Sequence, residues 1–226
     1  MRFLRPVSLI VLVLAFDQCL KFWIKLDFTY NESKRIFSWF YLYFIENEGM
    51  AFGMTWGGEA GKLMLSLFRL LAVVLIGIYL VNIINKKAHP GFITSMSLIF
   101  AGALGNIIDS VFYGTIFSAS TASSPAVLFP SEGGYAALLH GRVVDMLYFP
   151  LFEGFLPKWL PVYGGDYFIF FRPIFNIADA SITCGVLMII LFQKRFFRKE
   201  EVSAADAAPE VSAENSDQAS TNEQTS

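Results

Sequence analysis

The chain has 226 residues, of which 55% are hydrophobic and 16% are charged. This composition excludes an ordinary soluble domain and is typical of an integral membrane protein. Residues 1–199 hold all 17 Lys and Arg but only 12 of the 19 Asp and Glu, which gives them a net charge of +5. Residues 200–226 hold the other seven acids and no base, a net charge of −7. This last segment has too few apolar residues to bury a core, so we predict a disordered acidic tail.

Four apolar runs are long enough to cross a bilayer as helices. The first follows Arg2 and Arg5, as in a secretory signal peptide, but no small-x-small cleavage site comes after it. Gly102 and Gly105 in the third run are expected to let helices pack closely. The fourth run begins at Pro173, a suitable first residue of a helix. The predicted spans are residues 7–25, 63–84, 92–110 and 173–193, with approximate ends.

Basic residues predict the orientation of these spans. Arg2 and Arg5, then Lys86 and Lys87, and finally the basic cluster at 194–199 all fall on one side of the membrane if there are four spans. The positive-inside rule makes that side cytoplasmic. We therefore predict an N-in/C-in topology, in which the acidic tail is cytoplasmic.

Two outer segments remain, 26–60 and 111–172. The aromatic run 36–45 in the first of them favours one or two strands of a small sheet. A turn is predicted after this run, where Gly49 permits unusual backbone angles and Asn47 offers a donor and an acceptor. The second outer segment is unusually long for a connection and forms an insertion whose fold the sequence does not specify.

Cysteines and histidines are few. Cys19 and Cys184 lie inside apolar runs, so we predict that they are small buried residues and not a disulfide. His89 and His140 are isolated, and the absence of a Cys/His cluster in the sequence makes a zinc protease an unfavourable hypothesis.

Two aspartates lie in apolar surroundings, where an ionisable residue indicates a functional site. Asp179 is expected about two helical turns into the fourth span, counted from Pro173, with Asn176 on the same face. Asp145 follows two valines and is expected at the same depth. Two adjacent carboxyls hold one proton between them, as hydrolysis by a carboxylate pair requires. The structural alternative is that each aspartate caps a helix or pairs with a cation.

Polar residues also interrupt the other spans. Asp17 and Lys21 are one helical turn apart, so they form either a structural ion pair or part of a substrate site. Asn106 and Asp109 share a face at the end of the third span, where Asn106 is expected to hydrogen-bond into a polar site. Arg69 either snorkels outward or pairs with an acid, and the sequence leaves both open.

Five blocks of residues carry a family resemblance. They are Asp17-Gln-x-x-Lys21, Asn47-x-Gly49-x-Ala51-Phe52-Gly53, Gly105-Asn106-x-x-Asp109, Gly141-x-Val143-Val144-Asp145 and Phe175-Asn176-x-Ala178-Asp179. In this order, among four spans, they resemble the blocks of the lipoprotein signal peptidase (signal peptidase II) family. The resemblance covers nearly all of residues 7–195.

This resemblance implies a membrane aspartyl endopeptidase, formed by residues 1–199, with Asp145 and Asp179 as its catalytic pair. The substrate would be a diacylglyceryl-modified prolipoprotein, cut just before the lipidated cysteine at the outer membrane–water interface. Asp17 and Lys21 would hold the architecture of the site. The residues implied to line or support it are Asn47, Gly49, Asn106, Asp109 and Asn176.

Further expectations come with the resemblance. No metal or organic cofactor is implied, and globomycin-type inhibitors should occupy the site. The location would be the cytoplasmic (inner) membrane of a bacterium, where membrane lipids surround a multi-pass protein. We expect a monomer and no nucleic-acid partner.

The chain departs from the family in two respects. Ser110 stands where the family usually has Arg, and Arg142 or Arg172 could supply the missing charge. The segments 111–140 and 148–172 are also longer than is usual in the family, and they could form a lid or a partner surface.

A competing hypothesis is a non-enzymatic membrane protein, either proton-coupled or lipoprotein-binding, whose carboxylates relay protons or bind a cation. Such a protein would spread its acids across the membrane, whereas Asp109, Asp145 and Asp179 gather near one face. A different intramembrane aspartyl protease is a third possibility, but the motifs here do not favour it.

Overall fold

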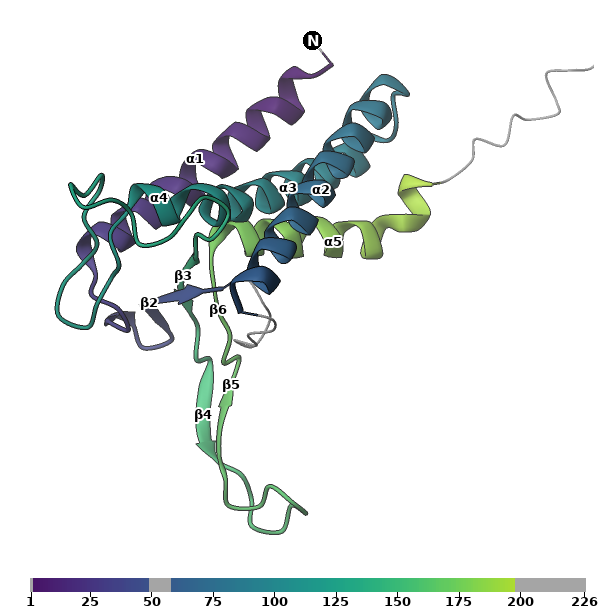
Figure 1. Cartoon of the computed structure of the whole chain (residues 1–226). Helices are drawn as coiled ribbons and strands as arrows, with labels where there is room; N and C mark the ends of the chain where they lie inside the picture. Colours follow the sequence, from purple (N-terminus) through teal and green to yellow (C-terminus); the bar gives the residue numbers. More distant parts are fainter. Residues whose placement is uncertain (1, 49–57, 198–226) are drawn as a thin grey trace, which may run out of the picture.

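A computed structural model of the chain describes residues 2–48 and 58–197 (Figure 1). The elements follow one another as α1 (Leu4–Asp27), β1 (Ser33–Phe37), β2 (Phe40–Asn47), α2 (Gly58–Asn85), α3 (Pro90–Ile108), the π-helical turn η2 (Asp109–Tyr113), α4 (Gly114–Ile116), β3 (Val143–Tyr148), β4 (Phe152–Phe155), β5 (Tyr167–Phe170), β6 (Ile174–Phe175) and α5 (Ile177–Phe196). The predicted tail 200–226 lies outside the described residues.

The four predicted spans are confirmed as helices long and apolar enough to cross a membrane. Both α1 and α2 are longer than predicted, and helical structure continues from α3 to Ile116. The start predicted for the fourth span was wrong, because α5 begins at Ile177 and not at Pro173. Residues Ile174 and Phe175 instead pair with β3 as a short strand, and Asn176 caps the helix after them.

Helix α3 packs against the other three long helices. Its contact with α5 is close because both helices carry glycine where they meet. A Cβ on Gly102 would lie 2.2 Å from the carbonyl oxygen of Ala178, and one on Gly185 would lie 2.6 Å from that of Ser95. The packing role expected of Gly102 is therefore observed, and it brings the end of α3 next to the start of α5.

A four-stranded antiparallel sheet, in the order β1-β2-β3-β6, lies at one end of the helices (Figure 1). The aromatic run 36–45 does form strands, as predicted. The sequence did not indicate that Asp145 also lies in a strand, where it is opposite Ile45 of β2. Asn47 is the last residue of β2, opposite Val143, so it does not lie in a turn.

The insertion after α3 covers a buried ion pair. Lys25 near the end of α1 pairs with Glu46 of β2, and the Ser120 hydroxyl is 3.2 Å from each of them. The rings of Phe117 and Tyr135, also from the insertion, lie over the Lys25 ammonium with centroids 5.4 Å and 5.0 Å away. This pair ties the sheet to α1, and the sequence did not predict it.

The prediction that the two cysteines are buried was wrong. Cys19 and Cys184 are both free and exposed on their helices. A membrane-crossing helix turns apolar residues outward toward lipid as well as inward, so lying inside an apolar run does not imply burial in the protein.

Replacing Gly102 by Ala should weaken the contact between α3 and α5, because the added Cβ meets backbone that cannot rotate away. We expect a loss of about 1–3 kcal/mol, measured as a lower unfolding temperature in detergent. Gly77→Ala is the matched control, since its Cβ would meet only the ring of Phe100, at 3.0 Å. Equal unfolding temperatures for the two variants would contradict the close contact.

Glu46→Ala should leave the Lys25 ammonium buried without its carboxylate. Removing one partner of a buried pair costs about 3–5 kcal/mol, and we expect unfolding by denaturant to report a loss of that order. The control is Asp27→Ala, which breaks the exposed pair with Lys34 and should cost about 0–1 kcal/mol. Similar losses in both variants would show that Lys25 does not depend on Glu46.

Candidate functional site

The start of α5 fixes Asp179. Asn176 is the N-cap residue, and its side-chain oxygen accepts a hydrogen bond from the Asp179 N–H at 2.9 Å, while the Asn176 N–H donates to the Asp179 carboxylate at 3.3 Å. This reciprocal capping places Asp179 in the first turn of the helix, not two turns inside it. A carboxylate in this position is stabilised by the positive end of the helix dipole.

Asp145 points from β3 toward the same cap. It is only 2% exposed, and its two oxygens accept hydrogen bonds from the amide of Asn176 at 2.7 Å and from that of Asn47 at 3.3 Å. Burial raises the pKa of the Asp145 carboxyl to about 7, helped by the nearby charge of Asp179. Near neutral pH this carboxyl can therefore both hold and release a proton.

Asn106 joins the two halves of the site. Its amide nitrogen donates to the Asp179 carboxylate at 2.7 Å. Its oxygen accepts hydrogen bonds from the Asn176 amide at 3.1 Å and from the Lys21 ammonium at 2.9 Å. The polar contacts expected for this side chain are thus present, and they connect α3 with α5 and α1.

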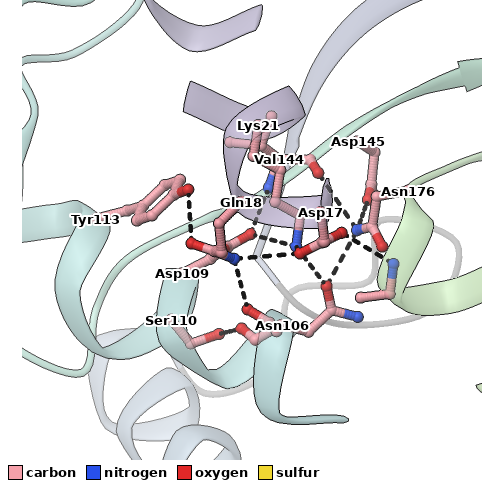
Figure 2. Close-up of polar contacts among 12 residues, drawn as sticks. Asp17, Gln18, Lys21, Asn106, Asp109, Ser110, Tyr113, Val144, Asp145 and Asn176 are labelled. Carbon is pink, nitrogen blue, oxygen red and sulfur yellow. Dashed lines mark hydrogen bonds and ion pairs between the residues drawn. The ribbon is translucent and has the colours of Figure 1, made fainter. Parts of the chain in front are cut away.

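Lys21 lies fully buried between two carboxylates (Figure 2). Its ammonium is 2.8 Å from the carboxylate of Asp17 and 2.9 Å from that of Asp109. The second oxygen of Asp17 accepts the Ala178 N–H at 2.9 Å, and the oxygen of Asp109 that faces Lys21 also accepts the Val144 N–H at 3.2 Å. The sequence left open whether Asp17 and Lys21 form a structural ion pair or shape a site. The geometry supports both roles, because the carboxylates around Lys21 hold the backbone of Ala178 and Val144. These two residues directly precede Asp179 and Asp145.

Gln18 and Tyr113 also belong to this network, and the sequence analysis gave them no role. The Gln18 amide donates to the Asp109 carboxylate at 3.0 Å, and the Tyr113 hydroxyl donates to the Gln18 oxygen at 3.1 Å. Figure 2 shows both beside Asp109. A polar amide inside an apolar span was the available signal for Gln18, whereas no signal marked Tyr113.

Ser110 is buried, and its hydroxyl donates to the Asn106 carbonyl at 3.1 Å. Neither of the arginines considered as a substitute lies at this position. Arg142 pairs with Glu46 and Glu48 instead, and Arg172 is exposed.

A different arginine lies near the two aspartates. Arg69 of α2 is close enough to Asp179 and Asp145 for their charges to act on it. One turn earlier, the Ser66 hydroxyl donates to the Leu139 carbonyl at 2.8 Å, just before β3. Arg69 therefore lies on the side of α2 that faces the site, within electrostatic reach of both acids.

Some expectations lie beyond the described residues. Gly49 lies outside the described residues, as does the rest of its block from Met50 to Gly53. Within residues 2–48 and 58–197, no group of three or more His, Cys, Asp or Glu side chains is arranged to hold a metal ion.

Comparison with known proteins gives relatives along most of the chain. The chain is 48% identical over 189 residues to the lipoprotein signal peptidase of Porphyromonas gingivalis (strain ATCC 33277), covering 83% of this chain and 82% of that protein. It is 36% identical over 185 residues to the lipoprotein signal peptidase of Amoebophilus asiaticus (strain 5a2), covering 80% and 74%. A bacterial membrane enzyme solved by the in meso method at 2.3 Å resolution superposes with a TM-score of 0.56 at 27% identity, covering 87% of this chain and 93% of that one.

The family model described as Signal peptidase (SPase) II matches residues 9–195. This range contains most of α1, the four-stranded sheet, the two aspartates and almost all of α5. On this match and on the identity to the Porphyromonas relative, the chain belongs to the signal peptidase II family.

Proposed function

We propose that this chain removes signal peptides from diacylglyceryl-modified prolipoproteins, cutting just before the lipidated cysteine, with Asp145 and Asp179 as its catalytic pair. One observation carries the assignment of the pair. The two carboxyls come from different elements, β3 and α5, and both are hydrogen-bonded to Asn176. Family membership supports the class of substrate.

The pair would hydrolyse the peptide by general acid–base catalysis. One carboxylate removes a proton from a water molecule, whose oxygen attacks the carbonyl carbon of the scissile bond. The other carboxyl gives its proton to the departing nitrogen, so the products are a free carboxylate on the signal peptide and an amine on the cysteine. Amide hydrolysis moves no electrons to an acceptor, so the step needs no redox cofactor.

The surroundings of the two carboxyls favour a division of roles. Asp145 is buried and its raised pKa keeps a proton near neutral pH, so it is suited to be the acid. Asp179 lies in the first turn of α5, where its carboxylate accepts hydrogen bonds from the Asn106 amide and the Asn176 N–H, so we assign it the role of the base. Because interacting carboxyls share their protons, this assignment of acid and base states where the shared proton lies before the reaction begins.

The proposed topology is N-in/C-in, with the sheet and the two long insertions outside. It is supported by the basic residues at the ends of α1, α2 and α5 that lie away from the sheet. The protein would then lie in the cytoplasmic membrane of a bacterium, with residues 1–199 as the peptidase domain. The acidic segment 200–226 would be a disordered tail in the cytoplasm.

The proposal also covers partners. Membrane lipids would surround the four spans, whose outward faces carry large apolar side chains. Globomycin-type inhibitors would bind across the two aspartates, and we propose that one copy of the chain suffices, because both aspartates come from the same chain.

Asp145→Asn and Asp179→Asn should each lower cleavage of a synthetic diacylglyceryl prolipoprotein at least about 100-fold, because an amide cannot exchange the shared proton. Mass spectrometry of the products would measure the rate and the position of the cut. Asp27→Asn, which changes an exposed acid, should cleave at the wild-type rate. Near-full activity in either site variant would remove that aspartate from the mechanism, and an inert wild type would favour the non-enzymatic hypothesis.

The pH dependence of kcat/KM should report the same proton. As the pH rises through about 7, Asp145 loses its proton and activity should fall, because no acid remains to protonate the leaving nitrogen. The charged groups facing the pair are Lys21 and Arg69.

Arg69→Gln should move this alkaline limb to higher pH, because removing a positive charge makes the pair hold its proton more tightly. The control is Arg35→Gln on the exposed strand β1, which should leave the limb in place. An alkaline limb that Arg69→Gln does not move would contradict a role for this charge at the pair.

A further inference from the structure

The hairpin formed by β4 and β5 stands apart from the rest of the protein. It projects well away from the helices and from the larger sheet (Figure 1), and each of its strands pairs only with the other. Nearly all of its side chains are exposed, including Trp159 at 78% and Val162 at 89%. An isolated two-stranded hairpin has little stability of its own in water, so a covering surface is needed. The large apolar side chains exposed along it are Leu151, Phe152, Phe155, Trp159, Val162, Tyr163, Tyr167, Phe168, Phe170 and Phe171.

The two faces of the hairpin differ in polarity. Phe152 is opposite Phe170, with their rings stacked 4.8 Å apart, and Gly154 is opposite Phe168 on the same side. This face is entirely apolar. The other face carries Glu153, Phe155, Tyr167 and Ile169, and the Glu153 carboxylate interacts with the Tyr167 hydroxyl. The polar groups of the two strands thus lie on one face only, beside Phe155 and Ile169, and the opposite face has none.

The tip of the hairpin is a built turn. The Leu156 N–H donates to the Asp166 carbonyl at 2.9 Å, and the Gly165 N–H donates to the Leu156 carbonyl at 3.0 Å. Between these bonds the chain presents Trp159 and Val162 outward. Trp159 and Val162 therefore form an exposed apolar surface at the tip, of the kind that marks contact with a protein or a membrane.

The base of the hairpin lies at the end of a membrane-crossing helix. Tyr148 of β3 pairs with Ile174 of β6, and α5 begins three residues later at Ile177. A row of aromatic rings continues from this base across the sheet. Phe149 stacks on Trp39 at 6.0 Å and on Phe175 at 5.6 Å. Tryptophan and tyrosine are enriched at the level where helices leave the bilayer.

We propose that the β4–β5 hairpin lies in the membrane–water interface, with Phe152, Phe168 and Phe170 against the hydrocarbon and Glu153 toward water. Helix α5 is long and apolar enough to cross a membrane and turns large apolar side chains outward, so a hairpin in the interface would extend the lipid-facing surface of that helix. Its charges also fit a neutral lipid surface, because residues 149–173 contain two acids and two bases. The apolar face drives the contact, so zwitterionic phosphatidylcholine suffices.

Spin labels on the full chain in phosphatidylcholine vesicles test this contact. Cysteines are introduced one at a time, as Phe168→Cys, Val162→Cys or Glu153→Cys, after Cys19→Ala and Cys184→Ala. Collisions with oxygen, which concentrates in lipid, are compared with collisions with a water-soluble nickel chelate. We expect the oxygen-to-nickel ratio at Phe168 and Val162 to exceed that at Glu153 several-fold, with no change on adding anionic lipid or salt.

A higher nickel accessibility at Phe168 and Val162 than at Glu153 would overturn the proposal. So would protection that appears only at high protein-to-lipid ratio, which indicates a second copy. Protection that appears only when a diacylglyceryl peptide is added would overturn it as well, because substrate would then be the partner. The readout needs no peptidase activity, so its failure is separate from failure of the proposed function.

A second measurement avoids any change on the hairpin strands. Brominated phosphatidylcholine should quench the tryptophan fluorescence of the unlabelled protein, and Trp159→Phe should remove part of the quenchable signal. An equal quenchable fraction in both proteins would contradict insertion of the tip.

Discussion

The buried ammonium of Lys21 is the interaction on which the site depends. A charge at this depth is tolerated only when carboxylates and hydrogen bonds replace its water, and Asp17, Asp109 and Asn106 do so. The two carboxylates also accept the N–H groups of Ala178 and Val144, each one residue before a proposed catalytic aspartate. One cation thereby fixes the start of a helix and the middle of a strand at the same point. All buried side-chain nitrogen and oxygen atoms of the described residues have a hydrogen-bond partner, so this polar core costs no unpaired group.

The same burial separates the two aspartates chemically. Asp145 lies inside the sheet–helix junction, where loss of water disfavours its charged form, and two amides limit that effect without cancelling it. Asp179 is half-exposed in the first turn of α5, where its carboxylate accepts hydrogen bonds from the Asn106 amide and the Asn176 N–H. Two identical side chains thus have different surroundings, because one lies in a strand and the other in a helix, and the two elements meet at Asn176. Hydrolysis by a carboxylate pair needs this asymmetry, since it requires one proton and two carboxyls.

The sequence predicts those parts of the fold and the site that depend on local patterns, and it misses those that depend on contacts between distant residues. The spans follow from hydropathy alone, and the polar residues of the site stand out because polar groups are costly in apolar runs. The predicted start of α5 was wrong because Pro173 is locally a good first residue of a helix. The strand pairing of Ile174 with Tyr148 prevents a helix there, and this contact between distant parts of the chain leaves no local signal. Lys25 near a helix end reads as a snorkelling lysine. Its burial under Phe117 and Tyr135 depends on where the insertion folds, which no local pattern indicates.

Ser110 illustrates how the fold accommodates its departure from the family pattern. Its small side chain turns back onto the Asn106 carbonyl, and its own carbonyl accepts the Gly141 N–H at 2.9 Å. A Cβ on Gly141 would lie 2.0 Å from the Asp109 carbonyl oxygen, so the chain before β3 runs tightly against this turn. A long cationic side chain has little room in that packing. The positive charge near the aspartates comes instead from Arg69 on α2, which approaches from a different helix. In the proposed mechanism Asp145 and Asp179 share one proton, so the four acids Asp17, Asp109, Asp145 and Asp179 would carry three negative charges against the two positive charges of Lys21 and Arg69. Without Arg69 the excess of negative charge would rise to two, and the proposed pair would hold its shared proton more tightly.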